Sequence, residues 1–360
     1  IRYICNHIDT IMPELANKPE REANNFDLLR ILFAWFVIVS HSYVLNGAGE
    51  SDPLGQLTSN YFILSFIGVK GFFVISGYLI LQSLTRSKSI LDYAAKRILR
   101  IFPGLIVVLL FTLAVVYFVF PPTNLPYLLN PSIYHYFWGN LMLFSPPFYI
   151  HGVFDQLPSK AINGSLWTIE FEFLFYIVLL LLFPIKKNNN ALKWILFSWM
   201  ILFTIGNLFY PAELLSIKKP IPLDLVFDLG IYFITGSFLA CFNWQNWAPS
   251  KYVFGGAILL LMILVFYKID RAWLFTCLPF IILYIGQKKS KAANWIHQKL
   301  GDPSYGIYLY AFPLQQLIVY YCKPSTFELF LYASIGAFAL GILSWRFVEK
   351  KALKLKQFIK

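Results

Sequence analysis

The sequence predicts an all-α integral membrane protein, a bundle of about ten transmembrane helices. Of its 360 residues, 58% are hydrophobic and only 13% are charged, whereas a soluble globular domain carries about 25% charged residues. Apolar stretches of about 18 residues recur along the chain, and each is long enough to cross a hydrocarbon layer of ~30 Å. Aromatic residues reach 19%, as expected for lipid-facing surfaces and interfacial belts.

Ten apolar runs bounded by polar, glycine or proline residues are predicted to span the bilayer. They cover residues 27–45, 61–82, 98–120, 165–184, 194–210, 223–242, 252–268, 272–287, 304–322 and 327–347. The stretch 121–163 is long, aromatic and rich in proline, and its apolar piece 133–150 is interrupted by Gly139, Pro146 and Pro147. That piece is therefore predicted to be a re-entrant or interfacial segment.

Lysine and arginine residues predict the orientation, because they collect in cytoplasmic loops. With the N-terminus inside, 21 of them fall in cytoplasmic segments and six in outer ones. Both termini are therefore expected in the cytoplasm, with an N-terminal segment 1–25, a transmembrane domain 26–348 and a basic tail 349–360. The net charge of +12 has two explanations, this bias or a polyanionic ligand such as a nucleotide cofactor. Nucleic acid is not an expected partner.

The N-terminal segment and the cysteines limit the possibilities further. Residues 1–25 are mixed polar and lack the apolar core of a cleavable signal peptide, so the first span is expected to act as an uncleaved anchor.

The four cysteines, Cys5, Cys241, Cys277 and Cys322, are far apart and form no CxxC pair. Neither a metal site nor a disulfide framework is predicted.

Arg30 and His41 are ionisable residues in the first span, and such residues inside a membrane are candidates for function. Their separation of 11 residues places both on one helix face, about 16 Å apart along the axis. That length is comparable to a pantetheine arm. The alternative is structural, with Arg30 reaching the inner headgroups and His41 lying near the outer interface.

Glu170 and Glu172 begin the fourth span and point in different directions, since two residues correspond to about 200° of helix rotation. Only one of them can share a cavity with His41. Their depth allows a histidine–carboxylate pair, which would orient the imidazole as a general base. The structural alternative is that a glutamate pairs with Lys70 of the second span or with an arginine.

The second and third spans carry further candidate residues. Arg97 and Arg100 are three apart and share a helix face, where they could bind phosphate or simply flank the membrane. Ser76 and Gly77 are small residues that allow close helix packing or passage of a ligand. Lys70 needs an acidic partner, and a glutamate of the fourth span is expected.

Together and in this order these segments resemble the acyltransferase-3 family of membrane acyltransferases, and the match covers most of the chain. Arg30 and His41 are similar to its Arg/Lys-x10-His motif, and Arg97 and Arg100 to its RxxR element. Longer segments also resemble family motifs: GVKGFFVISGYLI (68–80), SLWTIEFEFLFY (165–176), DPSYGIYLYAFPLQQ (302–316) and SWRFVEKKALKL (344–355). In this register Glu172 takes the position of the family glutamate.

The chain departs from the family at one position. Many members have a histidine just before the Phe-Pro pair of the late segment, and this chain has Ala311 there. A second catalytic histidine at that place is therefore excluded. Gln315 and Gln316 nearby could supply hydrogen bonds instead.

The resemblance implies an acyl-CoA-dependent O-acyltransferase of a bacterial inner membrane. The donor would be acetyl-CoA or another acyl-CoA, and the acceptor a hydroxyl of a cell-surface glycan or its lipid-linked precursor. Arg97 and Arg100, with Arg30, would hold the phosphates of the donor, and its arm would pass Ser76 and Gly77. His41, oriented by Glu172, would take the proton of the acceptor hydroxyl.

A transporter, flippase or glycan polymerase remains the alternative from the sequence. Charges inside the membrane, broken helices and a long outer loop also suit such proteins. None of them requires an acyl-CoA site, so a test for acyl-CoA binding distinguishes an acyltransferase from these alternatives.

Overall fold

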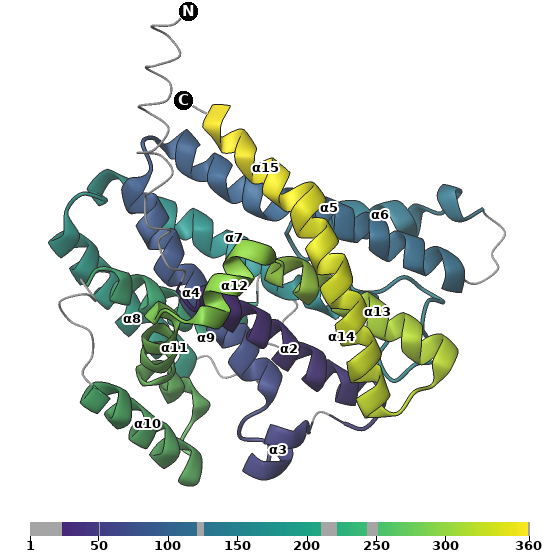
Figure 1. Ribbon diagram of the computed structural model, residues 1–360, viewed down its shortest axis with the longest axis horizontal. Coiled ribbons are helices and arrows are strands. Elements are labelled where there is room, and N and C mark those ends of the chain that lie inside the picture. Colours follow the sequence, from purple (N-terminus) through teal and green to yellow (C-terminus); the bar gives the residue numbers. More distant parts are fainter. Residues whose placement is uncertain (1–23, 50, 121–125, 210–221, 243–250, 359–360) are drawn as a thin grey trace, which may run out of the picture.

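A computed structural model describes residues 24–49, 51–120, 126–209, 222–242 and 251–358. It is all-helical in these ranges (Figure 1). The N-terminal segment and Cys5 lie outside the described residues apart from Asn24 and Asn25. The main helices are α2 (Phe26–Leu45), α3 (Pro53–Thr58), α4 (Leu64–Arg86), α5 (Ile90–Val119), α6 (Pro131–Leu141), α7 (Trp167–Leu180), α8 (Asn189–Phe209), α9 (Leu223–Ala240), α10 (Lys251–Phe266), α11 (Leu278–Gln287), α12 (Lys291–Lys299), α13 (Ser304–Cys322), α14 (Thr326–Ser344) and α15 (Lys350–Lys354).

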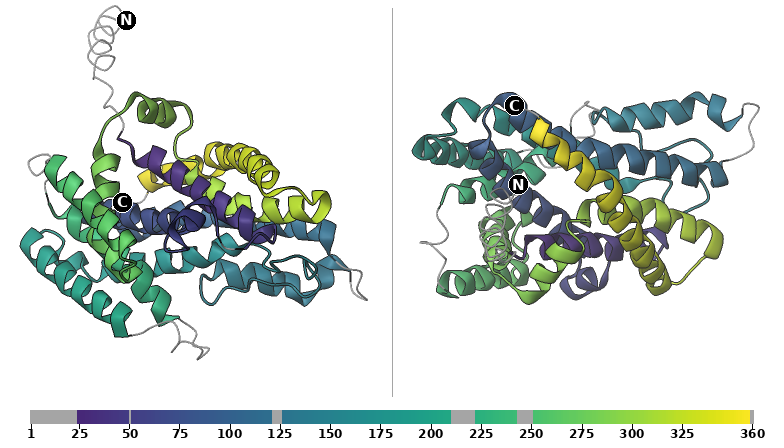
Figure 2. Two further views of the ribbon diagram at one scale, coloured as in Figure 1. Left: turned by 90° about the horizontal axis from the view of Figure 1, so that it is seen from below. Right: turned by 45° about the horizontal axis from the view of Figure 1, so that its top comes forward.

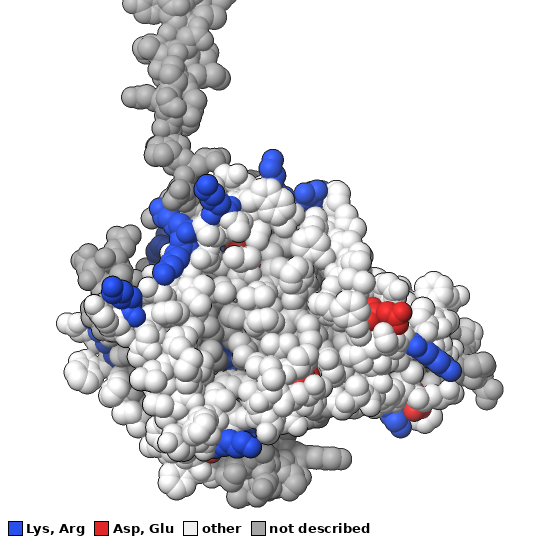
Figure 3. Space-filling view, turned by 60° about the horizontal axis from the view of Figure 1, so that its bottom comes forward, with Lys and Arg blue, Asp and Glu red and all other residues white. Residues whose placement is uncertain are grey.

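Six of these helices are long and apolar enough to cross a membrane. They are α2, α4, α5, α8, α9 and the continuous helix from α14 to Phe358. Figure 3 shows that basic side chains gather at the edges of one face and that few charged side chains occupy the broad band between them. These features are those of a multi-pass membrane protein. The full count of ten spans stays a prediction.

The predicted segments alternate in direction between two faces of the bundle. At the face predicted to be cytoplasmic, called the inner face, Asn25 donates to the carbonyl oxygen of Ile285 at 3.0 Å. There Asn189 also donates to the carbonyl oxygen of Cys241. At the opposite, outer face, Asn46 donates to Thr326 at 3.1 Å. At these three places helix ends meet as the predicted directions require, although the full topology and the face that meets the cytoplasm stay predictions.

Helices α4 and α9 form the centre of the bundle, and glycines allow their backbones to touch. In the most apolar window of each, 56% of the residues are buried, against 17% in α8 at the periphery. A Cβ atom on Gly77 would lie 1.9 Å from the carbonyl oxygen of Phe233, and one on Gly236 would lie 2.3 Å from that of Val74. Gly77 therefore serves helix packing.

Lys70 has a different partner from the predicted one. Its ammonium pairs with Asp228 of α9 and lies over the rings of Phe66 and Tyr232. The expected pairing with a glutamate of the fourth span is therefore wrong. The Lys70 side chain leaves α4 toward α9, whereas the fourth span contacts a different side of α4. Helix periodicity within one segment does not show which helix lies on which side. This ion pair, in which Lys70 is buried and the Asp228 side chain is 43% exposed, links the two central helices.

The C-terminal part of the chain continues as a helix where a basic tail is predicted. After α14 comes one π-helical turn, η6 (Trp345–Glu349), followed by α15 and a 3-10 turn, η7 (Leu355–Phe358). The continuous helix formed by α14, η6, α15 and η7 crosses α5, as Figures 1 and 2 show. Glu349 is buried, and Leu353 and Lys356 reach the cavity described below.

Replacing Gly77 by alanine is expected to lower the free energy of unfolding by about 1–3 kcal/mol, because the added methyl meets the backbone of α9. The matched control is Gly255→Ala on α10, where a Cβ meets nothing within 4 Å and the change should be neutral or stabilising by up to about 1 kcal/mol. Thermal unfolding in detergent measures both. Equal melting temperatures of Gly77→Ala and wild type would contradict the close packing.

Candidate active site

A cavity of about 430 Å³ runs along α4 from the inner face. Side chains of α2, α4, α5, α7, α13, α15 and η7 line it. On α4 the lining residues recur every three or four positions from Val69 to Arg86, so that one face of the helix forms the wall. At 1.5 Å per residue this wall is about 25 Å long.

Five predicted site residues line this cavity. They are Arg30, Ser76, Arg97, Arg100 and Glu172. They come from α2, α4, α5 and α7. The cavity thus brings together residues as far apart in the sequence as Arg30 and Glu172, which are 142 positions apart. Gly77 and His41 are not among the lining residues. For Gly77 the predicted contact with the donor arm is wrong, because this residue faces α9 instead.

The cavity is strongly basic at its inner end. Arg86, Lys96 and Lys356 line this end. Lys96 pairs with Asp92 at 2.8 Å. Within the part of the chain that the structure describes, Arg86 and Lys356 have no carboxylate at ion-pair distance. These side chains create a positive potential at the entrance, which favours an anionic ligand.

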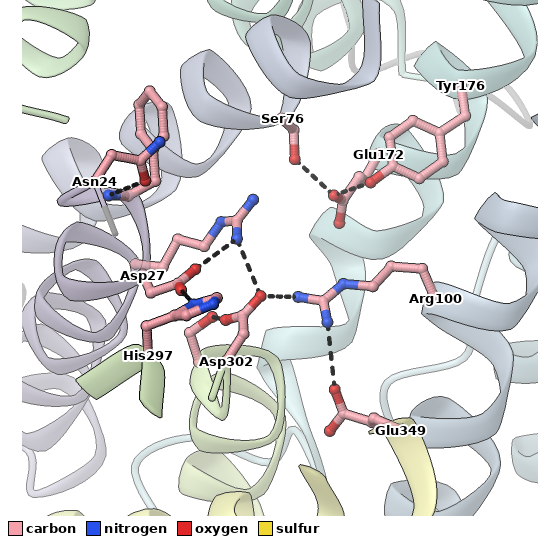
Figure 4. Close-up of polar contacts among 12 residues, drawn as sticks. Asn24, Asp27, Ser76, Arg100, Glu172, Tyr176, His297, Asp302 and Glu349 are labelled. Carbon is pink, nitrogen blue, oxygen red and sulfur yellow. Dashed lines mark hydrogen bonds and ion pairs between the residues drawn. The ribbon is translucent and has the colours of Figure 1, made fainter. Parts of the chain in front are cut away.

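Asp302 binds two of the predicted arginines, as Figure 4 shows. Its Oδ2 accepts from Arg30 at 3.0 Å and from Arg100 at 2.6 Å, and its Oδ1 accepts from Ser304 at 2.5 Å. Burial alone would raise the pKa of the Asp302 carboxyl, but Arg100 and Arg30 lower this pKa to about 2. The carboxylate therefore stays ionised at neutral pH. Arg100 also lies 3.7 Å from buried Glu349.

Arg97 differs from the other two arginines. Its Nη2 donates to Ser83 at 3.2 Å, and its guanidinium lies over the rings of Tyr93 and Tyr176. Among the residues described, its Nε has no hydrogen-bond partner and no carboxylate pairs with its guanidinium. Of the three arginines predicted to bind phosphate, Arg97 is the one with charge left for a ligand.

Glu172 faces the cavity, and Glu170 does not line it. The Oε1 atom of Glu172 accepts from Ser76 at 2.8 Å and also from the hydroxyl of Tyr176 (Figure 4). The predicted hydrogen bond between Glu172 and His41 is absent from the described structure. The predicted pair is wrong in this arrangement because Glu172 is directed toward α4 and its own helix.

Three side chains that line the cavity far from its basic entrance are called the end wall: Phe72, Thr168 and Tyr308. The hydroxyl groups of Thr168 and Tyr308 are 2.9 Å apart, and the ring centroids of Phe72 and Tyr308 are 5.6 Å apart. Thr168 also donates to the carbonyl oxygen of Ser165 at 3.3 Å. The end wall joins α4, α7 and α13.

His41 lies beyond the end wall, toward the outer face. Its ring contacts Phe312 edge to face at a centroid distance of 5.1 Å, and Phe312 follows Tyr308 by one turn of α13. The Nδ1 atom of His41 is buried and has no partner in the described part of the chain. Gln315 holds α13 against α2 on this level, donating to the carbonyl oxygen of Ile38 and to Ser42.

Several residues of the site were missed by sequence reasoning. Asp302 and Tyr308 lie in a segment that resembles a family motif, and Thr168 lies in another, but their spacing says nothing of what they contact. The signal for Asp302 was its position, since an acidic residue two positions before an apolar span can supply the counter-charge that buried arginines need. Among the described residues no cluster of histidine, cysteine or acidic side chains could hold a metal ion.

Comparison with known proteins identifies the relatives of this chain. A family profile described as "Acyltransferase domain", of the acyltransferase-3 type, matches residues 24–346. The O-acetyl transferase of Shigella phage Sf6 is 31% identical over 346 residues, covering 92% of this chain and 96% of that protein. Nodulation protein 10 of Rhizobium leguminosarum bv. viciae is 28% identical, covering 92% and 94%. No solved structure matches significantly.

Changing Asp302 to asparagine is expected to lower the free energy of unfolding by about 1.5–3 kcal/mol, since the two arginines lose their shared carboxylate while Asp27 and Glu349 stay near them. Asp155→Asn is the control, because Asp155 is exposed and accepts from Gly152 in a turn, where an amide oxygen serves as well. Its effect should stay within about 0.5 kcal/mol. A denaturation series in detergent measures both, and similar midpoints would argue against the two-arginine contact.

Proposed function

The chain belongs to the acyltransferase-3 family, and we propose that it moves an acetyl or other acyl group from acyl-CoA to a hydroxyl of a cell-surface glycan or its lipid-linked precursor. The observation that carries this proposal is the deep cavity with a basic entrance and the uncommitted Arg97 inside it. The name of the phage relative, an O-acetyl transferase, favours acetyl. The proposed location is a bacterial inner membrane.

The donor enters this cavity from the inner face. Its nucleotide end carries several phosphate charges, which Arg86 and Lys356 attract at the entrance, and Arg97 binds phosphate beside Ser83. Arg30 and Arg100 are held by Asp302, with Asp27 at 3.5 Å from Arg30 and Glu349 at 3.7 Å from Arg100, so their charges are balanced and they contribute a fixed shape. From Ser83 to Phe72 the α4 wall measures about 16 Å. This length suits the pantetheine arm and brings the thioester near Glu172 and the end wall.

His41 is the proposed general base. It accepts the proton of the acceptor hydroxyl while the hydroxyl oxygen attacks the thioester carbonyl carbon, and the carbon–sulfur bond breaks. The thiolate of CoA then takes up the proton that His41 received. General-base catalysis contributes about 10²–10⁴-fold. Because His41 lies behind Tyr308 and Thr168, the two hydroxyls must separate before the thioester and the acceptor can meet.

Glu172 is proposed to act on the donor side. It accepts hydrogen bonds from Ser76 and Tyr176, which holds both hydroxyls at the place where the thioester would lie. This role differs from that of orienting His41, because the two side chains are not bonded. The acceptor, a glycan or glycolipid, would approach His41 from the outer face, so donor and acceptor need not share an entrance.

Membranes carrying His41→Ala are expected to lose at least about 100-fold of acyl transfer and to keep donor binding, because His41 does not line the donor cavity. Transfer is measured as radiolabel passing from acetyl-CoA into the host glycan fraction, and binding by thermal protection of purified protein. His135→Ala, at an exposed histidine of α6, should retain both. Full transfer by His41→Ala would end this assignment.

Arg97→Ala is expected to weaken acetyl-CoA binding by about 10–100-fold, the loss of one charge-assisted contact. The matched control is Arg346→Ala, an exposed arginine that donates to the carbonyl oxygen of Lys299 and does not line the cavity. Isothermal titration with acetyl-CoA measures both dissociation constants. Failure of the wild type itself to bind acyl-CoA would favour the transporter or polymerase alternative.

A further inference from the structure

The deep end of the donor cavity differs in character from its entrance. The entrance is basic, whereas the deep end is lined by Val69, Phe72, Ile169, Thr168 and Tyr308. Three of these side chains are aliphatic or aromatic hydrocarbons, and the hydroxyls of the other two bond to each other. A group held there meets a mainly apolar surface without free charge, which suits the hydrocarbon part of an acyl group.

The end wall is braced on both sides. The ring of Phe72 contacts the ring of Tyr308 at 5.6 Å and that of Phe33 at 5.9 Å, each edge to face. Phe33 in turn fills the space left by Gly71, where a Cβ would lie 2.3 Å from its ring. Tyr308 and Thr168 are 6% and 5% exposed. Because close-packed interiors give way little, Phe72 has little freedom to move aside.

The space between the proposed thioester position and the end wall is short. Ser76, which donates to Glu172, lies one turn of α4 nearer the entrance than Phe72. The two residues are about 6 Å apart along the helix axis. An arm anchored at Arg97 and Ser83 reaches this level with its thioester. A long acyl chain would therefore run into the Phe72 ring.

We propose that Phe72, supported by Tyr308 and Phe33, restricts the donor to short acyl groups such as acetyl and propionyl. This inference rests on the proposed function, which it extends by naming the class of donor and the residue that selects it. Phe72 acts by exclusion, because added methylene groups would have to displace a packed aromatic ring. Replacing it with a small residue opens space at the same position.

The experiment compares acetyl-, propionyl-, butyryl- and hexanoyl-CoA on the purified full chain, by dissociation constant and by transfer to the host glycan fraction. The wild type is expected to bind hexanoyl-CoA at least about 10-fold more weakly than acetyl-CoA. Phe72→Ala should raise the ratio of hexanoyl to acetyl binding by at least about 10-fold. Phe72→Leu provides a milder variant should the alanine protein fail to fold, and its ratio should change in the same direction.

The control is Phe111→Ala on α5, whose ring packs against Tyr310 and does not line the cavity. This variant should keep the wild-type ratio. Equal binding of acetyl- and hexanoyl-CoA by the wild type would overturn the inference and leave the proposed function standing. An unchanged ratio in folded Phe72 variants would also overturn it. Binding of no CoA thioester by the wild type would instead overturn the proposed function.

Discussion

The contact on which the site depends is the ionised carboxylate of Asp302 between Arg30 and Arg100. It joins α2 and α5 to the start of α13, and Arg100 extends the contact to Glu349 in the π-helical turn after α14. Removing these arginines from bulk water is costly unless a carboxylate compensates their charge. With both arginines held in this way, Arg97 stands beside them with its charge free for a phosphate group.

The bundle separates two chemical environments along its axis. On the inner side of the end wall lies a basic cavity with Glu172, and on the outer side lies His41 against Phe312. The hydrogen-bonded side chains of Tyr308 and Thr168 line the cavity at this end, and Tyr308 lies one turn of α13 before Phe312. For a transferase that uses a soluble donor from one side and a glycan from the other, such a wall would keep water and acceptor away from the thioester until both substrates are present.

Much of the fold follows from hydropathy, and the reason is the membrane itself. Each predicted span coincides with a helix or a helix extended by a 3-10 turn, within a few residues for most of them, because a bilayer requires long apolar segments with satisfied backbones. The interrupted piece 133–150 contains most of the short helix α6, which begins at Pro131. Glu172 facing the cavity and Glu170 lying off it agree with the register of the family motif.

The sequence by itself determined the order of the apolar segments, the basic inner ends and the helix face on which each candidate lies. Only the tertiary structure decided which faces meet: Lys70 pairs with Asp228, Gly77 packs against α9, Asp302 takes Arg30 and Arg100, and Glu172 bonds to Ser76 and Tyr176 instead of His41. The physical reason is that residue spacing defines directions around one helix axis, whereas the rotation and neighbours of that helix result from packing of the whole bundle.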